Sequence, residues 1–102
     1  MLFIETPIFT KQASGGLFND EELKQLQTEL LKNPCKGDLI TGSGGLRKIR
    51  LARKGRGKSG GFRVIYYRNT PEIIFLLLAY PKNKQENLTK AELKLLRELI
   101  ED

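Results

Sequence analysis

Residues 62–80 have the sequence FRVIYYRNTPEIIFLLLAY, and this stretch decides the fold. It contains two apolar, strand-like blocks, Phe62 to Arg68 and Ile73 to Tyr80. Only Asn69-Thr70-Pro71-Glu72, residues typical of a turn, separates them. Parallel neighbours need a crossover of about a dozen residues or more, so this short link predicts an antiparallel strand pair.

Further strand-like segments lie upstream of this pair. Leu46 to Arg53 forms a third block, joined to the pair by a glycine-rich basic loop, Lys54 to Gly61, and it predicts another antiparallel neighbour. Leu39-Ile40 marks a short candidate strand before Gly42–Gly45. Near the N-terminus, a short and partly alternating apolar pattern, broken by Pro7, predicts a first strand that contains Phe3, Ile4, Ile8 and Phe9.

Two helices complete the pattern. Asn19 and Glu22 form a capping-box motif, and leucines at helical spacing predict a helix from about Asp20 to Lys32. Thr89 and Glu92 form a second capping box ahead of a C-terminal helix. The order of elements predicts an α+β domain, in which an N-terminal and a C-terminal helix pack on an antiparallel twisted sheet of about four strands.

The composition predicts one folded domain with a polyanionic partner. The chain has 102 residues, of which 39% are apolar, so we expect a single domain over residues 1–102. The net charge is +6 and the isoelectric point is near 9.6. No acidic residue stands between Asp38 and Glu72, whereas half of the 18 Lys and Arg residues fall within that interval: Arg47, Lys48, Arg50, Arg53, Lys54, Arg56, Lys58, Arg63 and Arg68. Such a local cluster indicates nucleic acid or an acidic protein as partner.

The cysteine and histidine content argues against a metal centre. Cys35 is the single cysteine and the sequence has no histidine, so neither a Cys/His zinc set nor a disulfide framework is expected. We therefore expect no metal, no cofactor and a cytoplasmic location. The apolar run Ile73 to Ala79 is far shorter than the roughly 20 residues that span a bilayer, and the N-terminus lacks a signal-peptide pattern, so no membrane association is predicted.

Strand alternation gathers cations on one face of the predicted sheet. Lys48 and Arg50 alternate with Ile49 and Leu51, and Arg63 on the next strand can share the face of the two cations. RNA supplies its own nucleophile, the 2′-hydroxyl, so a cationic site can align it and stabilise the phosphorane without histidine. Lysine can transfer a proton while arginine stays charged, which favours Lys48 for proton transfer. The alternative is an ordinary solvated basic strand face.

Residues at the end of the last block could extend this face. Tyr80 is followed by Lys82 and Lys84, and Tyr67 with its neighbour Tyr66 offers an aromatic surface for a base. The alternative is that one of the two adjacent tyrosines packs in the core and that Tyr80 is a half-buried strand end.

The stretches GSGGLRKIR (42–50), KGRGKSGGFRVIYY (54–67) and LLLAYPKNKQENLT (76–89) closely resemble the HigB-like branch of the RelE toxin superfamily. The resemblance implies a RelE-like fold and the toxin of a type II toxin–antitoxin system, a metal-independent endoribonuclease that cleaves mRNA in the ribosomal A site. It also implies a cognate antitoxin, HigA-like with a helix-turn-helix domain, and operator DNA reached through that antitoxin as a further candidate partner.

The resemblance assigns roles to residues by position. Lys48 and Arg50 match the paired cations of the family's central strand, Arg63 matches its phosphate-stabilising arginine, and Lys82 with its neighbours matches the basic segment after the last strand. With Tyr80 added from its place at the end of the last block, the candidate catalytic set is Lys48, Arg50, Arg63, Tyr80 and Lys82. The candidate RNA- and ribosome-binding set is Arg47, Arg53, Lys54, Arg56, Lys58, Tyr67, Arg68 and Lys84. Lys84 stands where this branch more often has Glu, and Thr89 falls near a catalytic Tyr of RelE-like members. Tyr80 or Lys48 is then the candidate for proton transfer. The alternatives are a non-catalytic RNA- or DNA-binding module and a degenerate toxin that only binds its antitoxin.

Overall fold

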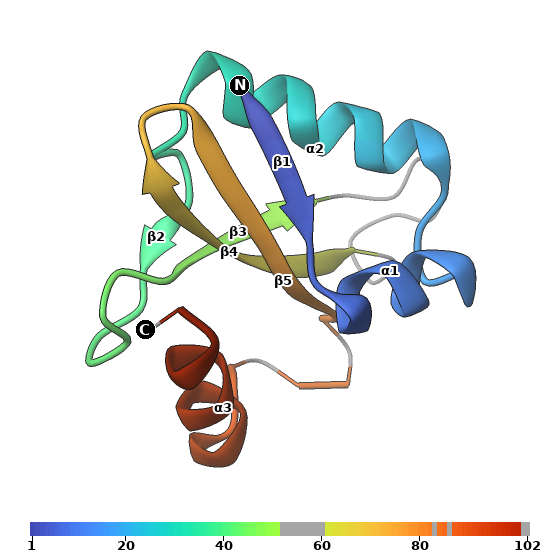
Figure 1. The fold of residues 1–102 in the computed structure, drawn as a ribbon. Coiled ribbons are helices and arrows are strands. Elements are labelled where there is room, and N and C mark those ends of the chain that lie inside the picture. Colours follow the sequence, from blue (N-terminus) through green and yellow to red (C-terminus); the bar gives the residue numbers. More distant parts are fainter. Residues whose placement is uncertain (52–60, 83, 86, 101–102) are drawn as a thin grey trace.

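A computed structural model describes residues 1–51, 61–82, 84, 85 and 87–100 (Figure 1). Within these ranges the elements follow one another as β1 (Leu2–Glu5), α1 (Pro7–Ser14), α2 (Asp20–Lys32), β2 (Asp38–Leu39), β3 (Arg47–Leu51), β4 (Phe62–Thr70), β5 (Ile73–Pro81) and α3 (Lys90–Ile100). The α+β class expected from the sequence is confirmed. None of the described helices is long and apolar enough to cross a membrane.

The described strands form one five-stranded sheet in the order β1-β5-β4-β3-β2. Strands β2 to β5 pair antiparallel, as the short link between residues 68 and 73 predicts. The expectation of a wholly antiparallel sheet is wrong at β1, which runs parallel to β5. The two strands are separated by most of the chain, so no hairpin turn constrains their direction, and β1 lies beside the last strand at the edge (Figure 1).

The first predicted strand also ends earlier than its apolar pattern suggests. β1 stops at Glu5, and Ile8 and Phe9 belong to helix α1. Thr6 is the N-cap residue, whose hydroxyl accepts a 3.1 Å hydrogen bond from the Phe9 N–H, and Pro7 occupies the first helical position. Proline is favoured there because its fixed φ suits the helix and its missing N–H needs no partner. Pro7 therefore starts a helix instead of interrupting a strand.

Both helices predicted from capping boxes are confirmed. In α2, Asn19 accepts from the Glu22 N–H at 2.8 Å, and the Glu22 carboxylate accepts from the Asn19 N–H at 2.9 Å. Thr89 and Glu92 make the same reciprocal pair at the start of α3. These pairs satisfy N–H groups that lack partners within the helix, so the helices begin where the sequence indicates.

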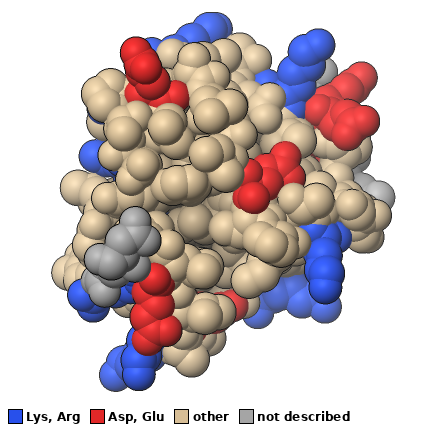
Figure 2. All heavy atoms as spheres, viewed as in Figure 1, with Lys and Arg blue, Asp and Glu red and all other residues tan. Residues whose placement is uncertain are grey.

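The helices cover opposite faces of the sheet, and each face has its own core. The larger core lies under α1 and α2 and contains Phe9, Phe18, Leu26, Leu30, Ile49, Leu51, Phe62, Val64, Tyr66, Ile74, Leu76 and Ala79. The smaller core lies under α3 and contains Leu46, Ile65, Leu77, Tyr80 and Leu96. We call these two sides of the sheet the α1–α2 face and the α3 face. Figure 2 shows the molecule from the side of Figure 1, where uncharged side chains dominate the middle and Lys and Arg lie towards the margins.

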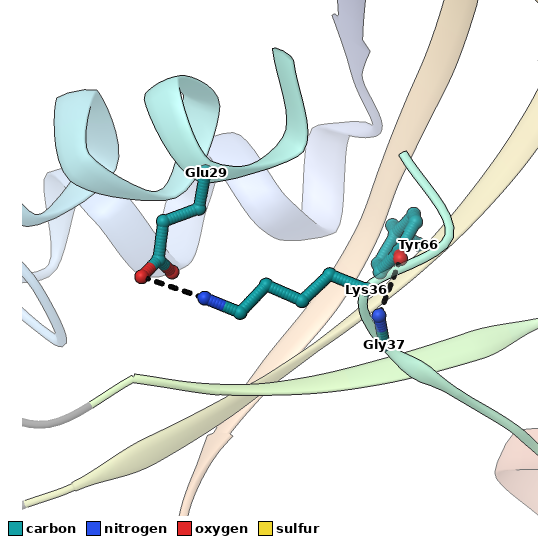
Figure 3. A network of polar contacts seen from close by, with 4 residues as sticks. All are labelled: Glu29, Lys36, Gly37 and Tyr66. Atoms are coloured by element: carbon teal, nitrogen blue, oxygen red, sulfur yellow. Dashed lines mark hydrogen bonds and ion pairs between the residues drawn. The ribbon is translucent and has the colours of Figure 1, made fainter. Parts of the chain in front are cut away.

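The Tyr66 side chain connects the segment after α2 to the sheet. Its buried hydroxyl accepts a 2.9 Å hydrogen bond from the Gly37 N–H and donates one of 2.8 Å to the Pro34 carbonyl. Burial raises the pKa of the Tyr66 phenol more than the Gly37 hydrogen bond lowers it. Close by, Lys36 pairs with Glu29 at 3.0 Å (Figure 3), but an exposed ion pair of this kind contributes little stability. The Tyr66 hydroxyl therefore anchors the α2–β2 connection to β4.

This arrangement predicts that Gly37→Ala destabilises the protein. A methyl group at Gly37 would lie 2.8 Å from Cε1 of Tyr66 and 2.9 Å from the carbonyl oxygen of Lys48. Overpacking of this kind costs about 1 to 3 kcal/mol. We expect a lower midpoint of urea unfolding than for Gly15→Ala, whose methyl group would come no closer than 3.2 Å to its nearest neighbour, the carbonyl oxygen of Lys11. Equal midpoints for the two variants would contradict the prediction.

Candidate active site

Strand register brings three predicted site residues into one row across the sheet. Arg50 on β3 lies opposite Arg63 on β4, and Arg63 lies opposite Tyr80 on β5. Directly opposed residues of neighbouring strands point to the same side. The row lies on the α3 face, because the residues that flank it along the strands, Ile49, Leu51, Phe62, Val64 and Ala79, belong to the core of the α1–α2 face. Exposure falls along the row from Arg50, which is exposed, to Tyr80, which is buried.

Tyr80 and Arg63 are hydrogen bonded through their side chains. The Tyr80 side chain is 4% exposed, and burial raises the pKa of its phenol, although the hydrogen bond and the charge of Arg63 act in the opposite direction. The phenol therefore stays protonated at neutral pH and can donate a proton or a hydrogen bond, but it cannot act as a base there. The same contact fixes the Arg63 guanidinium beside the end of β5.

Lys48 lies in the next row of the α3 face. It stands opposite Ile65 on β4 and Asp38 on β2, so an acidic side chain neighbours it across the strand pair. Its Nζ donates a 3.1 Å hydrogen bond to Oδ1 of Asn87, in the segment between β5 and α3. Asn87 is absent from the set predicted from sequence, since an asparagine two residues before an N-cap carries no signal of its own. Only the path of the chain after β5 brings it to Lys48.

Polar contacts hold the segment that carries Asn87. The Gln85 Nε2 donates to the Asn87 carbonyl and to a Glu92 carboxylate oxygen, both at 3.0 Å. Burial raises the pKa of Glu92, but the hydrogen bonds from Thr89 and Gln85 outweigh it and leave the pKa below its ordinary value. Glu92 is therefore ionised at neutral pH and joins this segment to the first turn of α3.

Lys82 and Lys84 follow directly after the row. The Lys82 N–H donates a 3.1 Å hydrogen bond to the Gly61 carbonyl, which extends the β4–β5 pairing past the last residue of β5. The Lys84 N–H donates to the Pro81 carbonyl at 3.1 Å and closes a turn. Lys82 is partly buried and Lys84 is exposed. Both predicted cations thus lie at the end of β5 that carries Tyr80.

Arg47 and Arg68 lie apart from the row. Arg47 stands opposite Tyr66 on the α1–α2 face, and its Nη1 donates to the carbonyls of Cys35 at 3.2 Å and Gly37 at 2.7 Å. Arg68, near the other end of β4, places Nη1 3.8 Å from the Cys35 sulfur. These contacts give Arg47 a structural role at the α2–β2 connection, and the register does not bring either arginine to Arg50 and Arg63.

The two adjacent tyrosines have different surroundings. Tyr66 is buried in the core of the α1–α2 face, as one of the two alternatives from sequence proposed. Tyr67 is partly buried and packs against the core of the α3 face. The remaining basic residues predicted to bind RNA, Arg53, Lys54, Arg56 and Lys58, lie outside the described residues. The described part of the site is therefore Lys48, Arg50, Arg63 and Tyr80 with Asn87, and with Lys82 and Lys84 at its edge.

This arrangement suits a phosphodiester. Two guanidiniums in one row can bind phosphate oxygens in bidentate fashion. A lysine ammonium in the next row can exchange a proton, and a protonated phenol at the buried end can donate one. Arg50 and Arg63 directly oppose each other, and like charges in that position destabilise a sheet, so an anionic ligand between them would relieve the repulsion.

Comparisons with known proteins show the family and the fold of this chain. The family model described as the RelE toxin of the RelE/RelB toxin–antitoxin system matches residues 1–102. Among solved structures, a double-arginine mutant of the Escherichia coli toxin RelE in the free state is similar with a TM-score of 0.58. The two sequences are 19% identical, and the match covers 83% of this chain and 86% of that one. At this identity the structural match shows a shared fold, whereas the family match extends over the whole chain, and this chain therefore belongs to the RelE toxin family.

Proposed function

We propose that this chain is a HigB-like toxin that cleaves mRNA on the ribosome with the residues of the α3 face. The observation that carries the proposal is the row of Arg50, Arg63 and Tyr80 with Lys48 beside it. The family adds the toxin–antitoxin context. A surface that only binds nucleic acid has no need for a buried phenol held against an arginine, whereas a site that must stabilise a developing charge and supply a proton does.

The proposed reaction uses the RNA as its own nucleophile. The 2′-hydroxyl attacks the adjacent phosphorus, the 5′-oxygen of the next nucleotide leaves, and a 2′,3′-cyclic phosphate forms. Arg63 and Arg50 bind the non-bridging oxygens, whose negative charge increases in the phosphorane. Lys48 takes part in proton transfer, and the protonated Tyr80 orients Arg63 or donates to the 5′-oxygen. Lys82 and Lys84 bind flanking phosphates.

The proposed partners are those that the resemblance to the HigB-like branch implies. Ribosome-bound mRNA covers the α3 face, and a cognate antitoxin, HigA-like with a helix-turn-helix domain, holds the toxin inactive in the cytoplasm. Operator DNA would be reached through the antitoxin. The family supports the existence of an antitoxin, and the net charge of +6 supports an acidic surface on whatever partner covers the cations.

The test is to add the purified chain to mRNA with and without translating ribosomes and to map the new 5′ ends. The proposal expects cuts inside the reading frame only when ribosomes are present, with cyclic phosphate at the upstream fragment's 3′ end. Cuts on free mRNA would contradict the ribosome dependence. Salt-sensitive RNA binding without any new end would instead indicate the non-catalytic binding module, and an inactive chain that still binds its antitoxin would indicate a degenerate toxin.

A further inference from the structure

The outer edge of β5 is only half covered by a strand. β1 pairs with β5 from Ile73 to Leu76 and then ends. Beyond that point, residues of the following turn and helix take over the hydrogen bonds. The Thr6 N–H donates to the Leu76 carbonyl at 3.1 Å, and the Thr6 hydroxyl donates to the Leu77 carbonyl at 2.7 Å. The strand edge is thus continued past β1 by groups that do not belong to a strand.

Gln12 of α1 completes this edge. Its Nε2 donates a 2.6 Å hydrogen bond to the Ala79 carbonyl, and its Oε1 accepts one of 2.8 Å from the Ala79 N–H. The carboxamide therefore engages both backbone groups of one residue, as the peptide groups of a neighbouring strand would. The carboxamide of glutamine carries its donor and its acceptor on separate atoms, as a peptide group does, and the length of glutamine spans the gap from α1 to β5.

Ala79, whose backbone Gln12 holds, directly precedes Tyr80. The β4–β5 register shifts between Ile65 and Tyr66, so the pairing that sets Tyr80 opposite Arg63 is confined to the end of β5 beyond this irregularity. An irregularity of this kind disrupts the hydrogen-bond ladder locally and bends the strand, so the direction of the part beyond it depends on the contacts of that part. On its inner side this terminal part is held by β4, and on its outer side it is held by Gln12.

We propose that Gln12 is a positioning residue, which holds the end of β5 so that the Tyr80 phenol meets the Arg63 guanidinium. This inference rests on the proposed function for its catalytic consequence. Gln12 acts through the backbone of Ala79, the residue before Tyr80, to which both of its hydrogen bonds are made. A misplacement of about 1 Å at a reacting group can cost up to 100-fold in rate, so loss of this contact should affect turnover more than binding.

Two variants test the proposal. Gln12→Leu keeps the approximate size of the side chain and removes both hydrogen bonds, and we expect about a tenfold lower single-turnover rate of mRNA cleavage, with ribosome affinity changed by less than about twofold. Gln12→Glu keeps the acceptor and loses the donor. Its new carboxyl can donate to the Ala79 carbonyl when it is protonated, so its rate relative to wild type should rise as the pH falls. Thr10→Val is the matched control, because it removes only an exposed hydrogen bond from α1 to Glu5.

A second readout reports on Tyr80 without any substrate. The chain has three tyrosines, and ring ¹³C labelling with Tyr66→Phe and Tyr67→Phe variants assigns their NMR signals. We expect Gln12→Leu to shift the Tyr80 signal and its titration while those of Tyr66 stay in place, and Thr10→Val to move neither. If Gln12→Leu does not fold, Gln12→Glu is measured in the same way.

The outcomes separate the inference from the proposed function. An unmoved Tyr80 signal in a folded Gln12 variant overturns the positioning role, even where cleavage falls. Equal losses of rate and ribosome affinity also overturn it, because they indicate general damage. If the wild-type chain does not cleave mRNA, the proposed function fails, and the Tyr80 signal then decides by itself whether Gln12 holds the end of β5.

Discussion

Replacing Arg63 with alanine is expected to slow mRNA cleavage by about 100-fold or more, because removal of one preorganised donor from a charge-stabilising site costs about 10² to 10³ in rate. Arg63 is central in the row, between the exposed Arg50 and the buried Tyr80, to which its guanidinium is hydrogen bonded. A guanidinium held in this way needs no rearrangement when charge develops on the phosphorane. The measurement is the single-turnover cleavage rate on programmed ribosomes.

Two controls make this result specific. Lys24→Ala also removes one positive charge, but Lys24 is an exposed residue of α2, on the other face of the sheet, so only a small loss is expected. Arg63→Lys keeps the charge without the planar fork and should restore only part of the rate. If Lys24→Ala and Arg63→Ala slowed cleavage equally, net charge would explain the effect and the row would not be the active site.

The elements that the sequence predicts correctly are those with strong local signals. Both capping boxes satisfy helix N–H groups within four residues, so their helices begin as predicted. The turn between β4 and β5 likewise depends on residues next to it. The N-terminal error has a local origin as well, because the apolar pattern predicts one strand broken by Pro7, whereas Thr6 and Pro7 together start a helix. The direction of β1 depends on contacts across the whole chain, which no local pattern contains.

The candidate site likewise has features that the local sequence predicts and features that it does not. Alternation along a strand is local, and it correctly assigns Lys48 and Arg50 to one face, opposite Ile49 and Leu51. That Arg63 stands opposite Arg50 depends on the register between strands, which alternation leaves free by steps of two residues. The contact of Asn87 with Lys48 depends on the path of the segment before α3, and neither residue type nor spacing indicates it.

Replacing Lys48 with methionine is expected to lower the cleavage rate by about 100-fold, the scale at which a positioned proton-transfer group contributes. Lys48 lies one row from Arg50 and Arg63, and its Nζ is oriented by the 3.1 Å hydrogen bond to Asn87. If the ammonium exchanges a proton during the reaction, Lys48→Arg must be slow as well, because a guanidinium cannot be deprotonated in a protein. The measurement is the single-turnover cleavage rate of both variants on programmed ribosomes.

The alternative role for Lys48 is purely electrostatic, and the same variants distinguish it. A residue that only neutralises phosphate charge would be replaced well by arginine, so near wild-type cleavage by Lys48→Arg would contradict proton transfer. Lys36→Met is the matched control, since Lys36 carries the same charge but pairs with Glu29 away from the row. Tyr80→Phe completes the comparison: if it is slower than Lys48→Met and Lys48→Arg cleaves at nearly the wild-type rate, the phenol supplies the proton and Lys48 binds the phosphate.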